Sequence, residues 1–370
     1  MNILVLNPIL FSGEENLIPE VESIKDTMIY NMCLAFIELG HRVTLLAMED
    51  YRPQKEEEYD FELVFFKNEG KGILPAALPF SSKMYKYIKQ EEKHYHMILS
   101  SEAFGFHTFF AALVAPEKTV IWQELVAHQR KMKTIPSRLW HRLIVTLFFR
   151  KVRVTIGRSF PAVKFISNYI AHVSAQIVDH GIDISQFKLS RQKKQQFIVI
   201  AQLVGRKQID QVIDIFSEFL KMSGYESFKL LIAGRGPLEA TLKQLVGRLS
   251  LEENIVFLGF VSHQELNSYL SESYASLVRT KNDLNMVSIT ESIVSGTPVI
   301  CNRVSALSGF IENNRLGIAK DNWNEEDLVA IVGNEEYHKN CIAIREKLST
   351  KSAATRIVDI FLQSKNNLSR

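Results

Sequence analysis

The stretch Arg279–Asn302, RTKNDLNMVSITESIVSGTPVICN, predicts a loop, a helix, a turn and a strand in that order. Two acidic residues lie eight positions apart in it, Asp283 in the loop and Glu291 on the expected helix. The N-terminus of a helix presents unpaired backbone N–H groups and positive dipole charge, so it favours an anionic ligand such as a diphosphate. The alternative is an ordinary helix of an α/β domain whose acidic side chains are solvated.

The bulk composition limits the class of protein. A length of 370 residues favours two domains, and 46% of hydrophobic residues is typical of a soluble globular protein. A net charge of +3 is too small for a strong nucleic-acid binder, so no nucleic-acid partner is expected. The cysteines (Cys33, Cys301 and Cys341) lie far apart, so we expect reduced thiols and no metal site. The N-terminus, MNILVLNPILFSG, lacks the features of a signal peptide, and no apolar run is long enough to cross a membrane, so we expect a cytoplasmic protein.

The first half of the chain alternates strands with helices. Ile3–Leu6 predicts a buried strand, Asp26–Leu39 a helix, and Val43–Ala47 a second strand, which together make a βαβ unit. Further strands and helices are predicted at 61–66, 84–92, 97–100, 104–114 and 119–122.

Polar residues follow two of these strands, Ser101-Glu102 after the strand at 97–100 and Gln123-Glu124 after the strand at 119–122. Because the carboxyl ends of parallel strands meet at one edge of a sheet, we expect these side chains to face one cleft. The alternative for Glu102 is an acidic residue in the first turn of a helix, where it stabilises the helix dipole.

The segment 130–153 interleaves basic residues with Trp, Leu, Ile and Phe, and Pro136 is expected in its first helical turn. A basic amphipathic helix of this composition can lie on an anionic membrane surface. The alternative is a helix that packs on the core and has solvated charges. Further along, we expect a helix over Tyr169–Gln176 and a basic linker over Lys188–Gln196.

After the linker the alternation restarts, with elements predicted at 197–200, 209–222, 228–233, 238–249, 255–258, 265–271, 275–278 and 299–301. Two consecutive series of this kind predict an α/β fold of two doubly wound, Rossmann-like domains that face a central cleft. We expect the first domain at 1–190, the second at 191–345, and a C-terminal helix at 346–370 that packs back on the first domain.

Five short motifs carry a resemblance to a known family: HGIDISQF at 180–187, AQLVGRKQ at 201–208, LLIAGRGP at 230–237, IVFLGFV at 255–261 and GTPV at 296–299. By these motifs, their order and their strand–turn–helix context, the chain resembles the family 4 retaining glycosyltransferases of GT-B fold over most of 197–359. The family lysine is present as Lys207, whereas Gln202 and Gln208 stand where the family has an arginine and a glycine.

The resemblance implies that the second half binds a nucleotide-sugar donor, without a metal or another cofactor. Lys207 would stabilise the charge of the leaving diphosphate, and Glu291 would bind the ribose hydroxyls. Asp283 stands in the place of a glutamate that contacts the donor sugar. The remaining donor-side candidates are Arg206, Gln202, Val261 and the backbone N–H groups of Asn285, Met286 and Val287.

On the acceptor side, Gln123 stands at the place of a family histidine, and Glu124 takes that place if the register slips by one. Glutamine is neither an acid nor a base, but it can hydrogen-bond a sugar hydroxyl. The front-face mechanism drawn for the family needs no protein base, because the leaving phosphate takes the acceptor proton. His128 is a candidate replacement for the histidine, with a polar surface residue as the alternative, and Glu102 is another acceptor-side candidate.

These features predict a metal-independent glycosyltransferase that moves a sugar to a hydroxyl of a glycan or lipid-linked acceptor in cell-surface polysaccharide biosynthesis. A lipid-linked acceptor would suit a protein that lies on the inner face of the membrane through 130–153. Two alternatives stay open: a hydrolase or epimerase of nucleotide sugars, and a degenerate GT-B protein that binds a nucleotide or scaffolds a partner.

Overall fold

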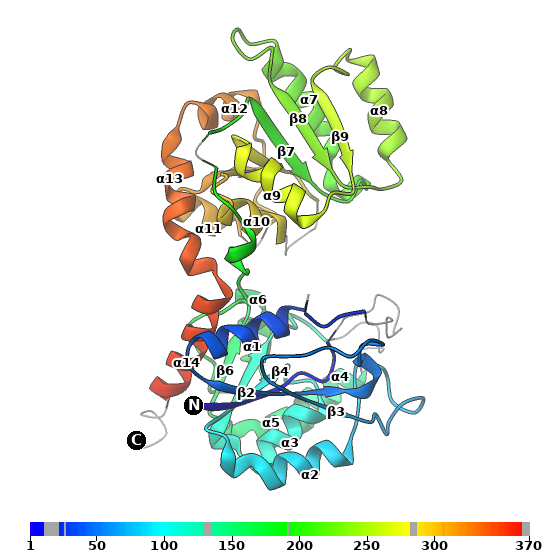
Figure 1. The fold of residues 1–370 in the computed structure, drawn as a ribbon, viewed down its shortest axis with the longest axis vertical. Helices are drawn as coiled ribbons and strands as arrows, with labels where there is room; N and C mark the ends of the chain where they lie inside the picture. The colour runs from blue at the N-terminus through cyan, green and yellow to red at the C-terminus, as the bar shows by residue number, and fades with distance from the viewer. Residues whose placement is uncertain are drawn as a thin grey trace. The chain divides into compact units, whose positions relative to one another are not determined.

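The computed structural model describes residues 1–10, 22–25, 27–128, 135–190, 192–281, 287–305 and 307–364, with His263 described by its backbone alone. The chain forms two compact units (Figure 1). Unit 1 comprises Met1–Gly181 and Thr350–Arg370, and unit 2 comprises Ile182–Ser349. The boundaries predicted at residues 190 and 345 therefore both lie inside unit 2.

Unit 1 is built on a parallel sheet with the strand order β3-β2-β1-β4-β5-β6. Its strands are β1 (Asn2–Leu6), β2 (Arg42–Met48), β3 (Glu62–Phe66), β4 (Met97–Ser101), β5 (Thr119–Gln123) and β6 (Val154–Gly157). β1 is central, with Ile3 opposite Val43 on one side and opposite Met97 on the other. Most of these strands are continuous apolar runs, as expected where helices cover both faces of a sheet. The first five strands confirm the sequence prediction, whereas β6 lies where no strand is predicted.

The helices of unit 1 are α1 (Met28–Glu38), α2 (Ser82–Glu91), α3 (Phe106–Val114), α4 (Ile135–Leu139), α5 (Thr146–Phe148), α6 (Phe160–Ile166) and α14 (Thr350–Ser364). Figure 1 shows α1 on one face of the sheet and α2 and α3 on the other. α14 comes from the far end of the chain and packs beside α1, where Ala354, Ile357 and Phe361 complete the core of this unit.

The prediction of a helix over Tyr169–Gln176 is wrong. The helix of this region is α6, which begins after Ser159, because the Ser159 hydroxyl accepts the Ala162 N–H and a proline stands in the first turn. Residues 169–176 instead run beside the edge strand β6, where the Thr155 N–H donates to the His172 carbonyl at 2.9 Å. The free edge of a sheet offers unpaired backbone groups, and this segment satisfies some of them.

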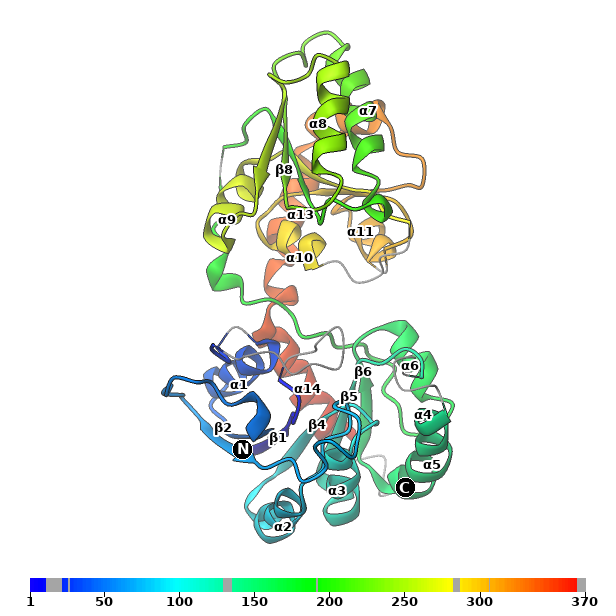
Figure 2. The same cartoon turned by 90° about the vertical axis from the view of Figure 1, so that its right-hand side faces the viewer.

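Unit 2 has a second parallel sheet, with the strand order β12-β11-β10-β7-β8-β9. Its strands are β7 (Gln196–Ile200), β8 (Lys229–Ala233), β9 (Ile255–Gly259), β10 (Ala275–Val278), β11 (Val299–Cys301) and β12 (Gly317–Ala319). Its helices are α7 (Ile209–Leu220), α8 (Glu239–Arg248), α9 (His263–Glu272), α10 (Val287–Val294), α11 (Ser308–Asn313), α12 (Glu325–Val332) and α13 (Glu335–Ile344). Figure 2 shows α7 and α8 on one face of this sheet and α9 on the other.

The segment predicted as a basic linker is anchored to unit 2 rather than free. The Lys193 ammonium donates to the carbonyls of Ser271 (2.9 Å) and Gly296 (3.2 Å) and to the Thr297 hydroxyl (3.1 Å). Burial lowers the pKa of Lys193 to about 8.

In the part of the chain that the structure describes, no helix is both long and apolar enough to cross a bilayer.

Candidate functional site

In unit 2, backbone hydrogen bonds join the loops that leave the carboxyl edge of the sheet. The Ala201 N–H donates to the Ala233 carbonyl (3.0 Å), and the Gly234 N–H donates to the Gly259 carbonyl (2.7 Å). Gly234 has a φ of +136°, and a Cβ there would lie 1.9 Å from the Ala201 carbonyl oxygen. Only glycine allows this approach, which explains the first glycine in the LLIAGRGP motif.

Lys207 is a buried cation at this edge, on the short 3-10 turn η8 (Gly205–Lys207). The side chain of its neighbour Arg206 is exposed. The Arg206 carbonyl accepts hydrogen bonds from the Lys281 N–H (2.9 Å) and from the Thr280 hydroxyl (3.2 Å). The turn that carries Lys207 is therefore fixed to the loop after β10, at the start of the stretch Arg279–Asn302 that contains Glu291.

The backbone conformation of Gln208 explains why a glycine stands at this position in the family that the chain resembles. Its φ is +47°, in the left-handed region that glycine adopts readily and other residues avoid. Gln208 also precedes α7 and provides no side-chain cap for that helix. The conformation belongs to the turn that presents Lys207, so the chain keeps the turn geometry and accepts the cost of a non-glycine residue.

Glu291 lies on α10 and is buried, with 8% of its surface exposed. Val287 begins the helix and is exposed. The helix therefore has its first residue at the surface and a carboxylate one turn further in, as the sequence predicts. Three predicted donor-side residues lie outside the described residues: Asp283, Asn285 and Met286.

The two remaining donor-side candidates lie on loops of the same edge. Gln202 is exposed on the loop after β7, and Val261 is half-buried on the loop after β9. Because β8 lies between β7 and β9, the loop that carries Gln202 and Lys207 and the loop that carries Val261 lie on either side of the end of β8, at the same edge of the sheet.

In unit 1, Glu102 and Gln123 contact each other at the carboxyl edge of the sheet. The Gln123 Nε2 donates to Glu102 Oε2 (2.8 Å), and the N–H groups of Glu124 (2.7 Å) and Leu125 (3.0 Å) donate to Glu102 Oε1. Burial raises the pKa of Glu102 to about 7, and the two backbone donors and the charge of Arg158 oppose this rise. The two strand ends that the sequence singles out therefore meet in one hydrogen-bonded cluster.

Arg158 is a cation of this edge that sequence reasoning missed. Its N–H donates to the Gln123 carbonyl (2.8 Å), and its guanidinium pairs with the carboxylates of Glu124 (2.6 Å) and Asp179 (3.1 Å). The guanidinium also lies over the Trp122 ring, 5.1 Å from its centre. The apolar run of β6 could have identified Arg158 from the sequence, because a residue that directly follows a parallel strand lies at this edge of the sheet.

His128 is held on both sides of its ring. Its Nδ1 lies 3.1 Å from the Ser137 hydroxyl, and its Nε2 lies 3.0 Å from the Tyr169 hydroxyl. The ring also packs against His141 and Phe165, and burial lowers the pKa of His128. Both ring nitrogens have protein partners, which favours a structural role for His128 over the place of the family histidine.

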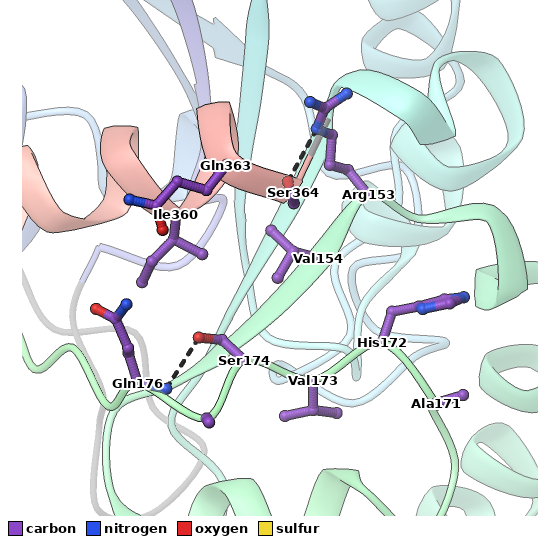
Figure 3. A pocket seen from close by; sticks show the side chains of 11 residues that line it. Arg153, Val154, Ala171, His172, Val173, Ser174, Gln176, Ile360, Gln363 and Ser364 are labelled. Carbon is purple, nitrogen blue, oxygen red and sulfur yellow. Dashed lines mark hydrogen bonds between the residues drawn. The ribbon is translucent and has the colours of Figure 1, made fainter. Parts of the chain in front are cut away.

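Arg153 belongs to the segment predicted to face a membrane, but its side chain is buried in unit 1. Its Nε donates to the Phe361 carbonyl near the end of α14 (3.1 Å). The same Nε donates to the Ser364 hydroxyl at 3.0 Å (Figure 3). It lines a cavity of about 350 Å³ together with residues of 171–176 and of α14. The guanidinium therefore caps the Phe361 carbonyl in the last turn of α14, and Arg153 is not part of the exposed basic surface.

In the described ranges, no group of three or more His, Cys, Asp or Glu side chains is arranged to hold a metal ion. Cys33, Cys301 and Cys341 are buried, and burial raises the pKa of the Cys301 thiol to about 12. The cysteines therefore act as small apolar residues of the cores.

The chain is similar to known proteins, most clearly in unit 2. Residues 182–348 match the family described as Glycosyl transferases group 1. The chain is 20% identical to Alpha-monoglucosyldiacylglycerol synthase of Streptococcus pneumoniae, over 54% of this chain and 49% of that protein. It is 26% identical to the Amylovoran biosynthesis glycosyltransferase AmsK of Erwinia amylovora, over 46% of this chain and 45% of that protein. The chain thus spans about half the length of the curated relatives it matches.

Solved structures share the fold along the whole chain. Sucrose-phosphate synthase from Thermosynechococcus elongatus matches with a TM-score of 0.58 and 13% identity, over 98% of each chain. HepE of Anabaena, solved in complex with UDP, matches with a TM-score of 0.58 and 14% identity, over 100% of each chain. The predicted α/β fold of two doubly wound domains, the GT-B fold, is confirmed.

Replacing Gln208 with glycine should stabilise unit 2. Glycine adopts the left-handed backbone without the cost to an L-residue, so we expect Gln208→Gly to raise the free energy of unfolding by about 1 kcal/mol. Gln211→Gly, inside α7, is the matched control and should lower it by about 1 kcal/mol. Urea denaturation measures both, and a loss of stability in both variants would contradict the expected gain.

The raised pKa of Glu102 should make stability depend on pH. In the folded chain this group titrates near pH 7, and in the unfolded chain it titrates at its ordinary lower value. The folded state therefore binds more protons between these values, and this contribution to stability is lost as the pH rises through about 7. We expect the stability difference between the wild type and Glu102→Gln to move against the wild type from pH 5 to pH 8 in urea denaturation. A difference that stays constant would show that Glu102 titrates normally.

Proposed function

Because residues 182–348 belong to the group 1 glycosyltransferases, we propose that the whole chain is a retaining glycosyltransferase with a nucleoside-diphosphate sugar as its donor. Its acceptor is a hydroxyl of a glycan or a lipid-linked saccharide in cell-surface polysaccharide synthesis. The observation that carries this proposal is the buried Lys207, on a turn fixed to the loop after β10, in the unit that also carries Glu291 on α10.

The relatives support these substrate classes. HepE was solved with UDP, and the name of the Streptococcus pneumoniae relative refers to a glycosylated diacylglycerol. A Mycobacterium tuberculosis relative, 22% identical over 45% of this chain, is a GDP-mannose-dependent phosphatidylinositol monomannoside mannosyltransferase. For this chain we therefore favour a lipid-linked acceptor and leave the base of the donor to experiment.

In the proposed reaction, the bond between C1 of the sugar and the diphosphate oxygen breaks. A bond forms between C1 and the acceptor oxygen on the same face of the sugar, and the acceptor proton moves to the leaving diphosphate. Lys207 stabilises the charge that develops on the diphosphate, and the N-terminus of α10 adds positive partial charge. We propose that these groups take the place of a metal ion and that no cofactor is used.

The other donor-side residues keep the roles that the resemblance implies. Glu291 accepts hydrogen bonds from two ribose hydroxyls, since a carboxylate has two oxygens for a vicinal diol. Asp283 contacts the donor sugar, and Arg206 adds positive charge near the diphosphate. The backbone N–H groups of Asn285, Met286 and Val287 complete the diphosphate site.

Ligand-induced stabilisation tests the donor class. We expect one of UDP, GDP, ADP and dTDP to raise the melting temperature of the full chain, because a ligand that binds the folded state stabilises it by mass action. The matching nucleotide sugar should then release nucleoside diphosphate when membrane extract is added. Release without an acceptor would point to a hydrolase, and tight binding without release would point to a non-catalytic protein.

Removal of the Lys207 ammonium should slow the transfer step. We expect Lys207→Ala to lower kcat/KM by about 30- to 1,000-fold, which corresponds to roughly 2–4 kcal/mol of lost charge stabilisation. Lys221→Ala is the control, since Lys221 is an exposed lysine that pairs with Glu218 next to α7. Circular dichroism tests whether both variants are folded, and near-normal turnover of a folded Lys207→Ala would remove Lys207 from the mechanism.

We further propose that unit 1 binds an anionic membrane surface and that the protein is peripheral on the cytoplasmic side. Residues 135–151 are helical throughout, with the π-helical turn η5 (Trp140–Val145) between α4 and α5. Apolar side chains four positions apart are all more than half exposed on it, and we call them the apolar ridge: Ile135, Leu139, Leu143 and Leu147. On an α-helix such positions drift around the axis, and the wider π turn reverses that drift, so the ridge stays straight.

Charge complements the apolar ridge. The exposed basic residues of this segment are Arg138, Arg142, Arg150 and Lys151. No aspartate or glutamate occurs anywhere from residue 125 to residue 178, so no acidic side chain of its own stretch neutralises these cations. Exposed leucines next to arginines suit the boundary between lipid headgroups and acyl chains.

Acidic substitutions on the apolar ridge should weaken lipid binding. We expect the double variant Leu139→Glu/Leu143→Glu to bind phosphatidylglycerol vesicles at least roughly tenfold more weakly than the wild type, because both the apolar contact and the charge attraction are lost. Leu362→Glu on α14 is the control, since Leu362 is an exposed leucine of unit 1 on another helix. Sedimentation with vesicles measures binding, and equal binding of all three proteins would contradict a membrane role for the apolar ridge.

A further inference from the structure

Glu102 has a backbone conformation that its neighbours must hold in place. Its φ is +64°, in the left-handed region that is costly for a glutamate. The Glu102 N–H donates to the Trp122 carbonyl (3.2 Å), and the Thr108 hydroxyl donates to the Glu102 carbonyl. Strained residues that their surroundings hold in this way concentrate at functional sites.

The carboxylate of Glu102 retains room for one more hydrogen bond. An ionised carboxylate has about four acceptor positions. Among the described residues, the N–H groups of Glu124 and Leu125 fill two of them at Oε1, and the Gln123 amide fills one at Oε2. The remaining position lies on Oε2, and it suits a hydroxyl donor from a ligand.

Gln123 has no such room. It is fully buried, and its Nε2 donates both to Glu102 Oε2 (2.8 Å) and to the Leu125 carbonyl (3.2 Å). Its Oε1 accepts the Ala103 N–H at 3.0 Å. A flipped amide would face the Ala103 N–H with an N–H and face Glu102 with an oxygen, so the orientation of Gln123 is fixed.

Trp140 holds the same loop from the opposite direction. Its indole Nε1 donates to the Ala103 carbonyl at 3.0 Å, so the two backbone groups of Ala103 are bound by Gln123 and by Trp140. The indole packs against the rings of Phe104 (5.8 Å) and Phe106 (5.1 Å). Ala103, which follows Glu102, is therefore bound by the first residue of the π-helical turn, in the same helical segment as the apolar ridge.

We propose that Glu102 binds the acceptor hydroxyl in unit 1, and that Gln123 and Trp140 are positioning residues that fix its carboxylate from two sides. This inference rests on the proposed glycosyltransferase function, because the resemblance implies acceptor-side residues in the first half of the chain, which forms most of unit 1. It gives Gln123 a role different from the sugar contact that the resemblance implies. It also makes the helical segment 135–151 a support of the acceptor site, since Trp140 follows Leu139 of the apolar ridge directly.

Steady-state kinetics of the full chain test this proposal, with the nucleotide sugar that stabilises the chain and with monoglucosyldiacylglycerol in phosphatidylglycerol vesicles as the acceptor probe. Gln123→Glu places an oxygen against Glu102 Oε2, and Trp140→Phe removes the indole donor but keeps a ring. We expect the acceptor KM to rise roughly tenfold in Gln123→Glu and about threefold in Trp140→Phe, with the donor KM within about twofold of the wild type. Tyr95→Phe is the control, since it deletes another hydrogen bond of unit 1, between Tyr95 and Tyr87.

A swapped variant separates contact from mere support. In Glu102→Gln/Gln123→Glu, an amide and a carboxylate still pair, so the melting temperature lost in Gln123→Glu should largely return. The acceptor KM should stay high, because the carboxylate no longer stands at residue 102. Full recovery of both quantities, or an unchanged acceptor KM in both single variants, would overturn the proposal. A wild type that shows no acceptor-dependent release would instead bring down the proposed function itself.

Discussion

Both sheets are parallel, so each has one edge at which every strand ends and from which the loops carry side chains. The two units hold these loops together by different means. In unit 2, backbone groups bond backbone groups, and Gly234 permits the approach of two loops that a Cβ would prevent. In unit 1, a side chain joins the two loops, since the Glu102 carboxylate accepts hydrogen bonds from the N–H groups of Glu124 and Leu125. Loops that are joined through backbone groups require only glycines where the loops approach closely. Loops that are joined through a side chain require that particular residue. This difference fits the finding that the family match is confined to 182–348.

The same difference decides how much could be predicted from the sequence. The apolar runs of β8 and β9, which end at Gly234 and Gly259, predicted two strands of unit 2, and the helix predicted to carry Glu291 is confirmed as α10. The roles of Lys207 and Glu291 come from the motifs of the resemblance and stay predictions. The strand β6 was missed because its apolar run follows directly on the basic helical segment, and Arg158 was missed with it. No helix forms over 169–176, and the helix of this region is α6 instead. The Ser159 cap and the proline of its first turn are the stronger signal for the start of a helix. The left-handed backbone of Glu102 could not be predicted, because it results from tertiary hydrogen bonds that no local pattern records.

The helical segment 135–151 shows how one short element can serve two surfaces. Its outward side chains are leucines and arginines, and its inward side chains, Trp140 and His141, pack on Phe104 in the loop after β4. In the π-helical turn, hydrogen bonds join residues five positions apart instead of four, and this wider turn lies where the inward face presents two large rings in succession. His141 illustrates the demands of that face, since its Nδ1 bonds the Ser137 carbonyl and burial lowers its pKa to about 4, which keeps the ring neutral.

The position of α14 has a consequence for the order in which the chain becomes folded. This helix is made after all of unit 2, yet Ala354, Ile357 and Phe361 belong to the core of unit 1. During synthesis, α1 and its neighbours must therefore wait with an apolar face uncovered while 168 further residues, Ile182–Ser349, are added and fold. Unit 2 is continuous in sequence and can close its own core as soon as it leaves the ribosome. The first half of the chain is thus the second to be completed, and a ribosome that stalls before residue 350 releases a finished unit 2 attached to an unfinished unit 1.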